Sequence, residues 1–203
     1  MDKIRILYFL EDRAQEGFIT ALVERIAKEE SISTERLTHE IRSGRGGSMV
    51  INEFRKFLKD YSEVGTTDAD FLVVAIDGNC MGHNERLDQL DSNIEPGHKF
   101  KDKVVYAIPN PHIERWYIMD QRALKEGVGL KKAPDLPTYK CEKGYYKLVL
   151  SKALKDSKVT SLLGGAEYAE KIVENIENLD SLGKQDSSFQ TFVADLRRMF
   201  KRS

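Results

Sequence analysis

The stretch Phe71-Leu-Val-Val-Ala-Ile-Asp-Gly-Asn79 decides the fold of this chain. Six apolar residues in succession, rich in Val and Ile, are typical of a strand that is buried on both faces of a sheet. The run ends abruptly at Asp77, and Asn79 follows after one glycine. In open α/β sheets, ligands bind just beyond the carboxyl ends of the strands. We therefore expect Asp77 and Asn79 to lie where such a fold carries its chemistry.

Strand and helix patterns alternate on both sides of this stretch. Further strands are predicted at residues 4–10, 37–41 and 104–108, and helical spacing of apolar residues occurs over 15–30, 49–61, 84–94 and 113–124. A turn is predicted at residues 65–70, before the central strand. This order indicates an α/β fold with a mostly parallel sheet, helices on both faces and right-handed crossovers.

The character of the sequence changes after residue 126. Residues 1–126 are predicted to form the α/β domain, and residues 127–203 a mainly helical extension packed on it. Helical patterns cover residues 145–154, 166–176 and 188–200. Asp186 and the two serines after it are candidates to cap the last helix.

Composition limits the classes of function. Hydrophobic residues make up 40% and charged residues 32% of the 203 residues, so a substantial core lies beneath a charged surface. The net charge of -1 excludes a global field that attracts nucleic acid, so such a contact needs a local basic patch or a basic partner. No run approaches the roughly 20 apolar residues that span a bilayer, so no membrane contact is predicted.

The chain has two cysteines, Cys80 and Cys141. Two cysteines cannot form a zinc site alone, and they do not suggest a disulfide framework. A reducing cytoplasm is therefore the predicted location.

Acidic residues end two of the predicted strands. Glu11 and Asp12 follow the first strand, and Asp77 and Asn79 follow the central one. If these strands are parallel neighbours, the side chains converge at one edge, and such oxygen ligands suit Mg²⁺ or Mn²⁺. Glu16, near the start of the next helix, is a further ligand, an acid/base group, or a favourable charge at a helix N-terminus. Each carboxylate taken alone equally fits a capping or turn role.

A second candidate set begins the helix after the last strand. His112, Glu114 and Arg115 fall at its start and are expected near the same edge. Trp116, the single tryptophan, is expected to pack in the core. Arg86 fits either a phosphate contact or a solvated helix face.

Basic and aromatic residues interleave after residue 130. The lysines are Lys131, Lys132, Lys140, Lys143 and Lys147, and the tyrosines are Tyr139, Tyr145 and Tyr146. This pattern suits nucleic-acid backbone contact and base stacking, although a solvated lysine-rich surface explains it as well. The glycine-rich residues 44–47 lack the lysine and Ser/Thr of a P-loop.

Taken together, these motifs resemble the Toprim fold, in the branch that includes OLD-family nucleases, RloB-like proteins and small bacterial Toprim-like proteins. Phe9-Leu-Glu-Asp12 looks like the first Toprim motif, with Glu11 in the glutamate position. Asp77-Gly-Asn79 looks like the Asp-x-Asp motif, and residues 108–120 are similar to a Glu-x-Trp segment of the small Toprim-like proteins. The resemblance covers roughly residues 4–120.

Two positions depart from the family pattern. Asp12 stands in place of the usual glycine, and Asn79 stands in place of the second aspartate. An amide offers a carbonyl oxygen to a cation but lacks the negative charge. Asp12, Glu16 or Glu114 must then supply that charge.

The resemblance implies a Toprim-type nuclease that uses Mg²⁺ (or Mn²⁺) to cleave DNA or RNA. In this interpretation Glu11, Asp77 and Asn79 hold the metal, and Glu16 or Glu114 orients water or adds a ligand. The phosphate contacts are expected from the basic side chains, namely His112, Arg115, Arg86 and Lys143.

The resemblance also implies a role in bacterial anti-phage defence with an ATPase partner, because the chain has no P-loop of its own. The sequence leaves a homodimer open. The alternative is a non-catalytic interaction or regulatory subunit, in which Asn79 marks a degenerate site.

Overall fold

A computed structural model describes residues 2–63 and 68–203 of the chain. Its core is a sheet of four strands, all parallel, in the order β2-β1-β3-β4. The strands are β1 (Ile4–Leu10), β2 (Leu37–Ser43), β3 (Phe71–Ala75) and β4 (Val104–Ala107). The predicted α/β class and its four strands are confirmed. Of the turn predicted at residues 65–70, residues 65–67 lie outside the described residues.

The register of the strands aligns their carboxyl ends. Leu10 of β1 pairs with Ala75 of β3, which in turn pairs with Ala107 of β4. Every residue of β3 is fully buried, as its unbroken apolar run predicts. The residues that follow β1, β3 and β4 therefore emerge at one edge of the sheet.

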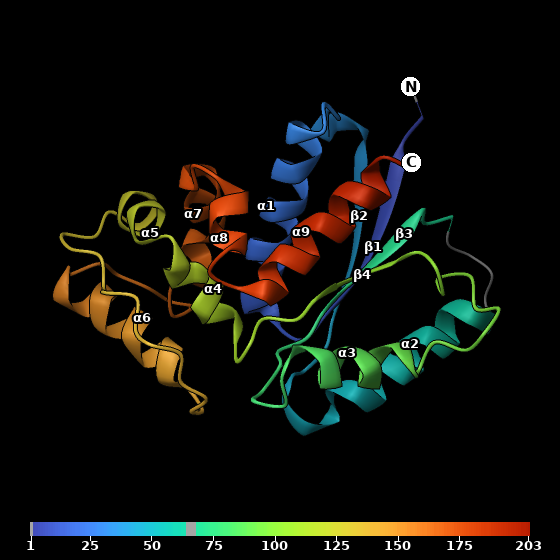
Figure 1. Cartoon of the computed structure of the whole chain (residues 1–203), viewed down its shortest axis with the longest axis horizontal. Coiled ribbons are helices and arrows are strands. Elements are labelled where there is room, and N and C mark those ends of the chain that lie inside the picture. The colour runs from blue at the N-terminus through green and yellow to red at the C-terminus, as the bar shows by residue number, and fades with distance from the viewer. Residues whose placement is uncertain (1, 64–67) are drawn as a thin grey trace.

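Two helices cover one face of the sheet, namely α2 (Val50–Glu63) and α3 (His83–Asp91). A short 3-10 turn (Gly47–Met49) precedes α2. Alternate strand residues such as Phe9 and Val74 pack beneath them with Phe54 and Phe57 of α2. Figure 1 shows these helices together on the side of the sheet away from α1 and α9. The predicted flanking helices are thus present on both faces.

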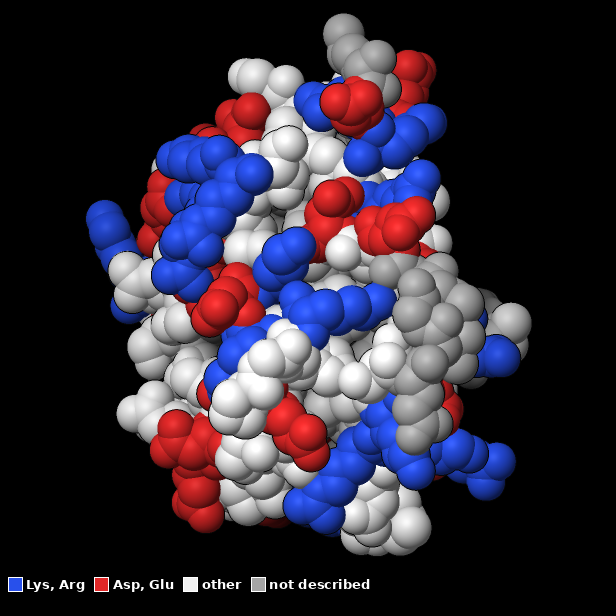
Figure 2. Space-filling view, turned by 90° about the vertical axis from the view of Figure 1, so that its right-hand side faces the viewer, with Lys and Arg blue, Asp and Glu red and all other residues white. Residues whose placement is uncertain are grey.

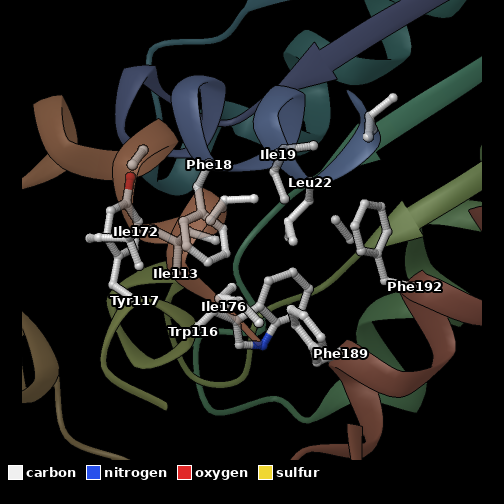
Figure 3. Packing of buried hydrophobic residues seen from close by; sticks show 14 of the residues in the cluster. Phe18, Ile19, Leu22, Ile113, Trp116, Tyr117, Ile172, Ile176, Phe189 and Phe192 are labelled. Atoms are coloured by element: carbon white, nitrogen blue, oxygen red, sulfur yellow. The ribbon is translucent and has the colours of Figure 1, made fainter. Parts of the chain in front are cut away.

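The opposite face is covered by α1 (Arg13–Glu29), which follows β1 directly, and by most of the later helices. The connection from α1 to β2 contains a 3-10 turn (Thr34–Arg36). Phe18 and Leu22 of α1 face Trp116 and the aromatic side chains of the last helix (Figure 3). Trp116 is 1% exposed and meets Phe189 edge-on, with ring centroids 5.1 Å apart. Its predicted packing role is confirmed.

The single helix predicted over residues 113–124 is wrong, because the structure breaks it in two. The first part is α4 (Ile113–Met119), and the second is α5 (Gln121–Val128). Asp120 lies between them in an extended conformation and accepts a hydrogen bond from the Ala123 backbone N–H at 2.8 Å. An aspartate that caps a new helix in this way ends the preceding one.

The tail is helical, as predicted, and packs on the same face as α1. It contains α6 (Tyr145–Asp156), a 3-10 turn (Ala166–Tyr168), α7 (Ala169–Asn175), α8 (Leu179–Gly183) and α9 (Ser187–Phe200). Asp186 caps α9 by accepting from the Phe189 N–H at 2.9 Å, which confirms one predicted cap. Helix α8 was not predicted. No helix in the described ranges is long and apolar enough to cross a membrane.

The prediction that the cysteines form no disulfide is contradicted. The structure joins Cys80 to Cys141, with their Cα atoms 5.4 Å apart. The two residues are 61 positions apart, and only the folded arrangement places the loop after β3 against the segment before α6. A covalent link thus ties the carboxyl edge of the sheet to the tail.

We expect reduction of this disulfide to lower the free energy of unfolding by up to about 4 kcal/mol, because it removes a cross-link that constrains the unfolded chain. Urea unfolding with and without dithiothreitol measures the difference. The double variant Cys80→Ser/Cys141→Ser is the control, since its unfolding must not respond to the reductant. Equal stability of the oxidised and reduced wild-type protein would contradict the assignment.

Candidate functional site

The ends of β1 and β3 bring two carboxylates together. The Glu11 backbone N–H donates to the Ala75 carbonyl oxygen at 2.9 Å and so continues the strand pairing by one residue. The Glu11 side chain turns toward β3, where Oε2 accepts from the Asp77 backbone N–H at 2.8 Å. Glu11 is only 6% exposed. The predicted convergence of Glu11 and Asp77 is what the structure shows.

Asp77 is held by three donors. Its Oδ1 accepts from the Gln15 side-chain amide at 2.9 Å and from the Ile113 backbone N–H at 3.1 Å. Its Oδ2 lies 3.2 Å from Nδ1 of His112. Helices α1 and α4 therefore both fix this carboxylate, and their N-terminal ends favour its negative charge.

His112 and Glu114 reach the site because the loop after β3 bonds to the segment after β4. Gly78 and Asn79 donate backbone hydrogen bonds to the carbonyl oxygens of Pro109 and Pro111, at 2.8 and 3.0 Å. A Cβ atom at Gly78 would lie 3.1 Å from Oδ1 of Asn110, so glycine allows the close approach. The first residues of α4 are thereby drawn beside Asp77. We call Glu11, Asp77, His112 and Glu114 the acidic edge.

The ionisation of the acidic edge is perturbed by burial. Burial, followed by the charge of Asp77, raises the pKa of Glu11 to about 7. Burial also raises the pKa of Asp77, against the opposing effect of its hydrogen bond with His112. The pKa of Glu114 is raised mainly by burial and further by Asp77. Carboxyl groups whose pKa values are raised by burial and by neighbouring charges are typical of a functional site.

His112 is oriented by its carboxylate partner. Its hydrogen bond with Asp77 is the main cause that raises the pKa of the imidazole. Its Nε2 atom is buried and, within the described part of the chain, has no hydrogen-bond partner. A histidine bound at Nδ1 by a carboxylate presents Nε2 for proton transfer or for ligand binding.

Two other predicted site residues lie outside this network. Glu16 faces β2, where its carboxylate accepts from the Ser43 hydroxyl at 3.3 Å. The side chain of Asn79 is exposed and lies 3.4 Å from the backbone oxygen of Asp77, within its own loop. Of the three carboxylates predicted to compensate for Asn79, Asp12 caps α1 by accepting from the Ala14 N–H at 2.9 Å. Glu114 interacts electrostatically with Asp77 and His112. Glu16 has its hydrogen bond elsewhere.

Three of the four predicted phosphate-binding residues each bind a different partner within the described residues. His112 is bound to Asp77, and Arg115 forms an ion pair with Asp186 at the start of α9. Arg86 is 7% exposed and donates to the Gln89 side chain of its own helix. Lys143 is exposed, before α6.

Sequence reasoning missed Gln15, which is fully buried. Its side chain links both carboxylate positions, because Oε1 accepts from the Glu11 N–H at 3.0 Å while Nε2 donates to Asp77. The available signal was an amide in line with the buried residues Phe18 and Ile19 on one helical face. Glu53 of α2 was also missed, and it accepts from the Arg45 N–H at 2.9 Å in the glycine-rich loop.

The donor atoms at this edge suit a hard divalent cation, but their present partners limit the fit. Glu11 and Asp77 supply carboxylate oxygens, and Mg²⁺ typically binds one or two carboxylates and keeps several waters. Within residues 2–63 and 68–203, however, no group of three or more His, Cys, Asp or Glu side chains is arranged to hold a metal ion. A cation at Oδ2 of Asp77 would compete with His112.

The raised pKa of Glu11 predicts how the variant Glu11→Gln changes stability with pH. Below pH 4.5 the carboxyl is protonated in both states, whereas between pH 4.5 and about 7 the folded state keeps a proton that the unfolded state loses. The wild-type protein therefore loses unfolding free energy as pH rises, by about 3 kcal/mol at this group.

The glutamine of Glu11→Gln does not titrate. We therefore expect the unfolding free energy of the variant, relative to wild type, to rise by that amount between pH 4.5 and pH 8. Any pH-independent effect of replacing the carboxyl group by an amide leaves this change unaltered. Denaturant titrations of both proteins across this range give the difference. Thr20→Ser, on α1, is a control whose difference from wild type must not change with pH. A pH-independent difference for Glu11→Gln would show that Glu11 is ionised normally.

The chain was compared with protein-family models, with curated proteins and with solved structures, and none of them matched. The acidic edge must therefore be interpreted from its own geometry, beside the motif resemblance of residues 4–120.

Proposed function

We propose that the protein is a divalent-cation-dependent phosphodiesterase that cleaves nucleic acid, in the manner of a Toprim-type nuclease. One observation carries this proposal: Glu11 and Asp77, from adjacent parallel strands, meet at the carboxyl edge of the sheet with His112 and Glu114 beside them. Burial of carboxylates with raised pKa values is energetically unfavourable, and a bound cation would stabilise their negative charge.

Glu11 and Asp77 are the residues proposed to hold Mg²⁺ or Mn²⁺. When bound, such a cation polarises a phosphate and helps to activate water. Gln15 fixes the relative position of the two residues, since it bonds to the backbone of one and the carboxylate of the other. Asn79 remains a proposed ligand through its amide oxygen, and its exposed position at the rim of the loop is compatible with that role.

His112 is proposed to move the proton in the reaction. The hydrogen bond with Asp77 raises the pKa of its imidazole and so favours the protonated form of the ring. We assign the Nε2 proton to the leaving oxygen of a phosphodiester, which requires the buried Nε2 atom to become accessible when the substrate binds. Glu114 adds negative charge beside this pair, and we assign it, rather than Glu16, to the role of compensating for Asn79.

An ATPase partner and a role in bacterial anti-phage defence remain proposals that rest on the motif resemblance. The absence of a P-loop from the sequence supports a separate source of ATP hydrolysis.

We expect purified protein, with or without such a partner, to cleave plasmid DNA or RNA in the presence of Mg²⁺ or Mn²⁺. Asp77→Asn and Glu11→Gln should abolish cleavage, and His112→Gln should slow it about 100-fold or more. Glu16→Gln should retain the activity, because Glu16 bonds to Ser43. Gel assays with matched protein preparations give the rates, and full activity in Asp77→Asn would refute the assigned site.

A second candidate function is a non-catalytic interaction or regulatory subunit. The observation that favours it is the full engagement of Asp77 by Gln15, Ile113 and His112, with Asn79 in place of a charged ligand. The two functions differ in metal binding. Calorimetric titration with Mn²⁺ should give heat that Asp77→Asn removes, whereas no binding with or without nucleic acid would favour the non-catalytic role.

A further inference from the structure

Positive charge is concentrated in one segment of the tail, residues 131–158. This basic segment contains eight lysines and three acidic residues, a net charge of +5. The other 175 residues contain 24 Lys and Arg and 30 Asp and Glu, a net charge of -6. A chain that is nearly neutral overall therefore has a strongly polarised charge distribution.

The lysines of the basic segment are exposed and available to a partner. They are Lys131, Lys132, Lys140, Lys143, Lys147, Lys152, Lys155 and Lys158. Salt bridges of Lys101 and Lys201 show that lysines elsewhere in the described ranges pair with carboxylates. No salt bridge among the described residues involves a lysine of the basic segment. Lysines without a carboxylate partner can neutralise phosphates and release their counterions.

Aromatic rings lie among these lysines. Tyr139 is 48% exposed, and its hydroxyl donates to Oδ1 of Asn110 at 3.3 Å. The Arg115 guanidinium lies 5.7 Å from the centre of the Tyr139 ring, in a cation–π contact. Lys140 lies 4.7 Å from the centre of the Tyr145 ring. An exposed ring such as that of Tyr139 can stack on unpaired bases.

The basic segment is physically joined to the acidic edge. The disulfide links Cys141 to Cys80, three residues after Asp77, and the Tyr139 hydroxyl binds the loop that leads to His112. Lys147, at the start of α6, acts on Glu114 and opposes the rise of its pKa. A strand that lies along the lysines would therefore reach the carboxylates.

Other surfaces offer less to a polyanion. On the side of the molecule shown in Figure 2, basic and acidic side chains are intermingled rather than separated. The groove between α1 and α7, with a volume of about 310 Å³, is lined by four acidic residues and two basic ones, namely Glu24, Glu29, Glu170, Glu174, Arg25 and Lys28. The excess of negative charge repels phosphates, so the groove is a poorer path for the strand than the basic segment.

We propose that residues 131–158 bind the backbone of a single-stranded nucleic acid and lead it to the acidic edge, with Tyr139 as a stacking platform. The proposal rests on the proposed function for the fate of the strand. The binding surface and the preference for a single strand do not depend on cleavage.

Binding can be measured without cleavage in the Asp77→Asn background with EDTA present. The probe is a fluorescent oligothymidylate of about 20 nucleotides, longer than typical single-strand sites. We expect Lys143→Gln/Lys147→Gln/Lys152→Gln to weaken binding about tenfold or more and to reduce the slope of log K against log salt by about 2. The matched control, Lys28→Gln/Lys56→Gln/Lys103→Gln, removes the same charge on α1, on α2 and before β4.

The control variant should bind within about twofold of its parent, because its lysines lie outside the basic segment. Tyr139→Ala should weaken binding of the single strand more than binding of a duplex of the same length. Equal affinities for the two triple variants would overturn the proposed surface, and tighter binding of the duplex would overturn the single-strand assignment.

The binding experiment and the cleavage experiment can fail independently of each other. Lysine-dependent binding by a protein that never cleaves with Mg²⁺ or Mn²⁺ would support this surface and refute the nuclease. Cleavage by wild type together with unchanged binding by Lys143→Gln/Lys147→Gln/Lys152→Gln would do the reverse.

Discussion

The contact between the Glu11 carboxylate and the Asp77 backbone N–H is the constraint on which the site depends. It exists because β1 and β3 are parallel neighbours whose last paired residues, Leu10 and Ala75, are in register. Burying two acidic side chains at such a junction is unfavourable unless donors surround them. Gln15 of α1 and Ile113 of α4 donate to the Asp77 carboxylate, so this residue fixes the position of two helix ends. The Glu11 carboxylate accepts instead from the backbone N–H groups of Asp77 and Gly47.

The sequence predicts the sheet well, because each strand is marked by an apolar run that ends in polar residues. It also predicts the meeting of Glu11 and Asp77, since parallel strands bring their carboxyl ends to the same edge. The break at Asp120 was missed because the apolar spacing of residues 113–124 continues through it. Asp120 itself has a side chain that favours the N-cap position and so indicates the start of a second helix.

The other errors concern contacts between distant parts of the chain. In the sequence, Gln15 is one polar residue on an otherwise apolar helix face. Its role depends on hydrogen bonds with two partners, one of them 62 positions away. Cys80 and Cys141 carry no spacing that predicts pairing, and only the packing of the tail brings them together. The placement of Glu16 beside Ser43 likewise follows from the direction in which α1 leaves β1.

The link between Cys80 and Cys141 also gives the molecule a cyclic part. The covalent ring runs through β4, α4 and α5 and contains His112 and Glu114, whereas Glu11 and Gln15 lie on the linear part that precedes it. A protease that cuts the ring once, at any point between residues 81 and 140, leaves a single covalent molecule under oxidising conditions. The same cut under reducing conditions yields two fragments, one with Glu11 and Asp77, held together by packing alone.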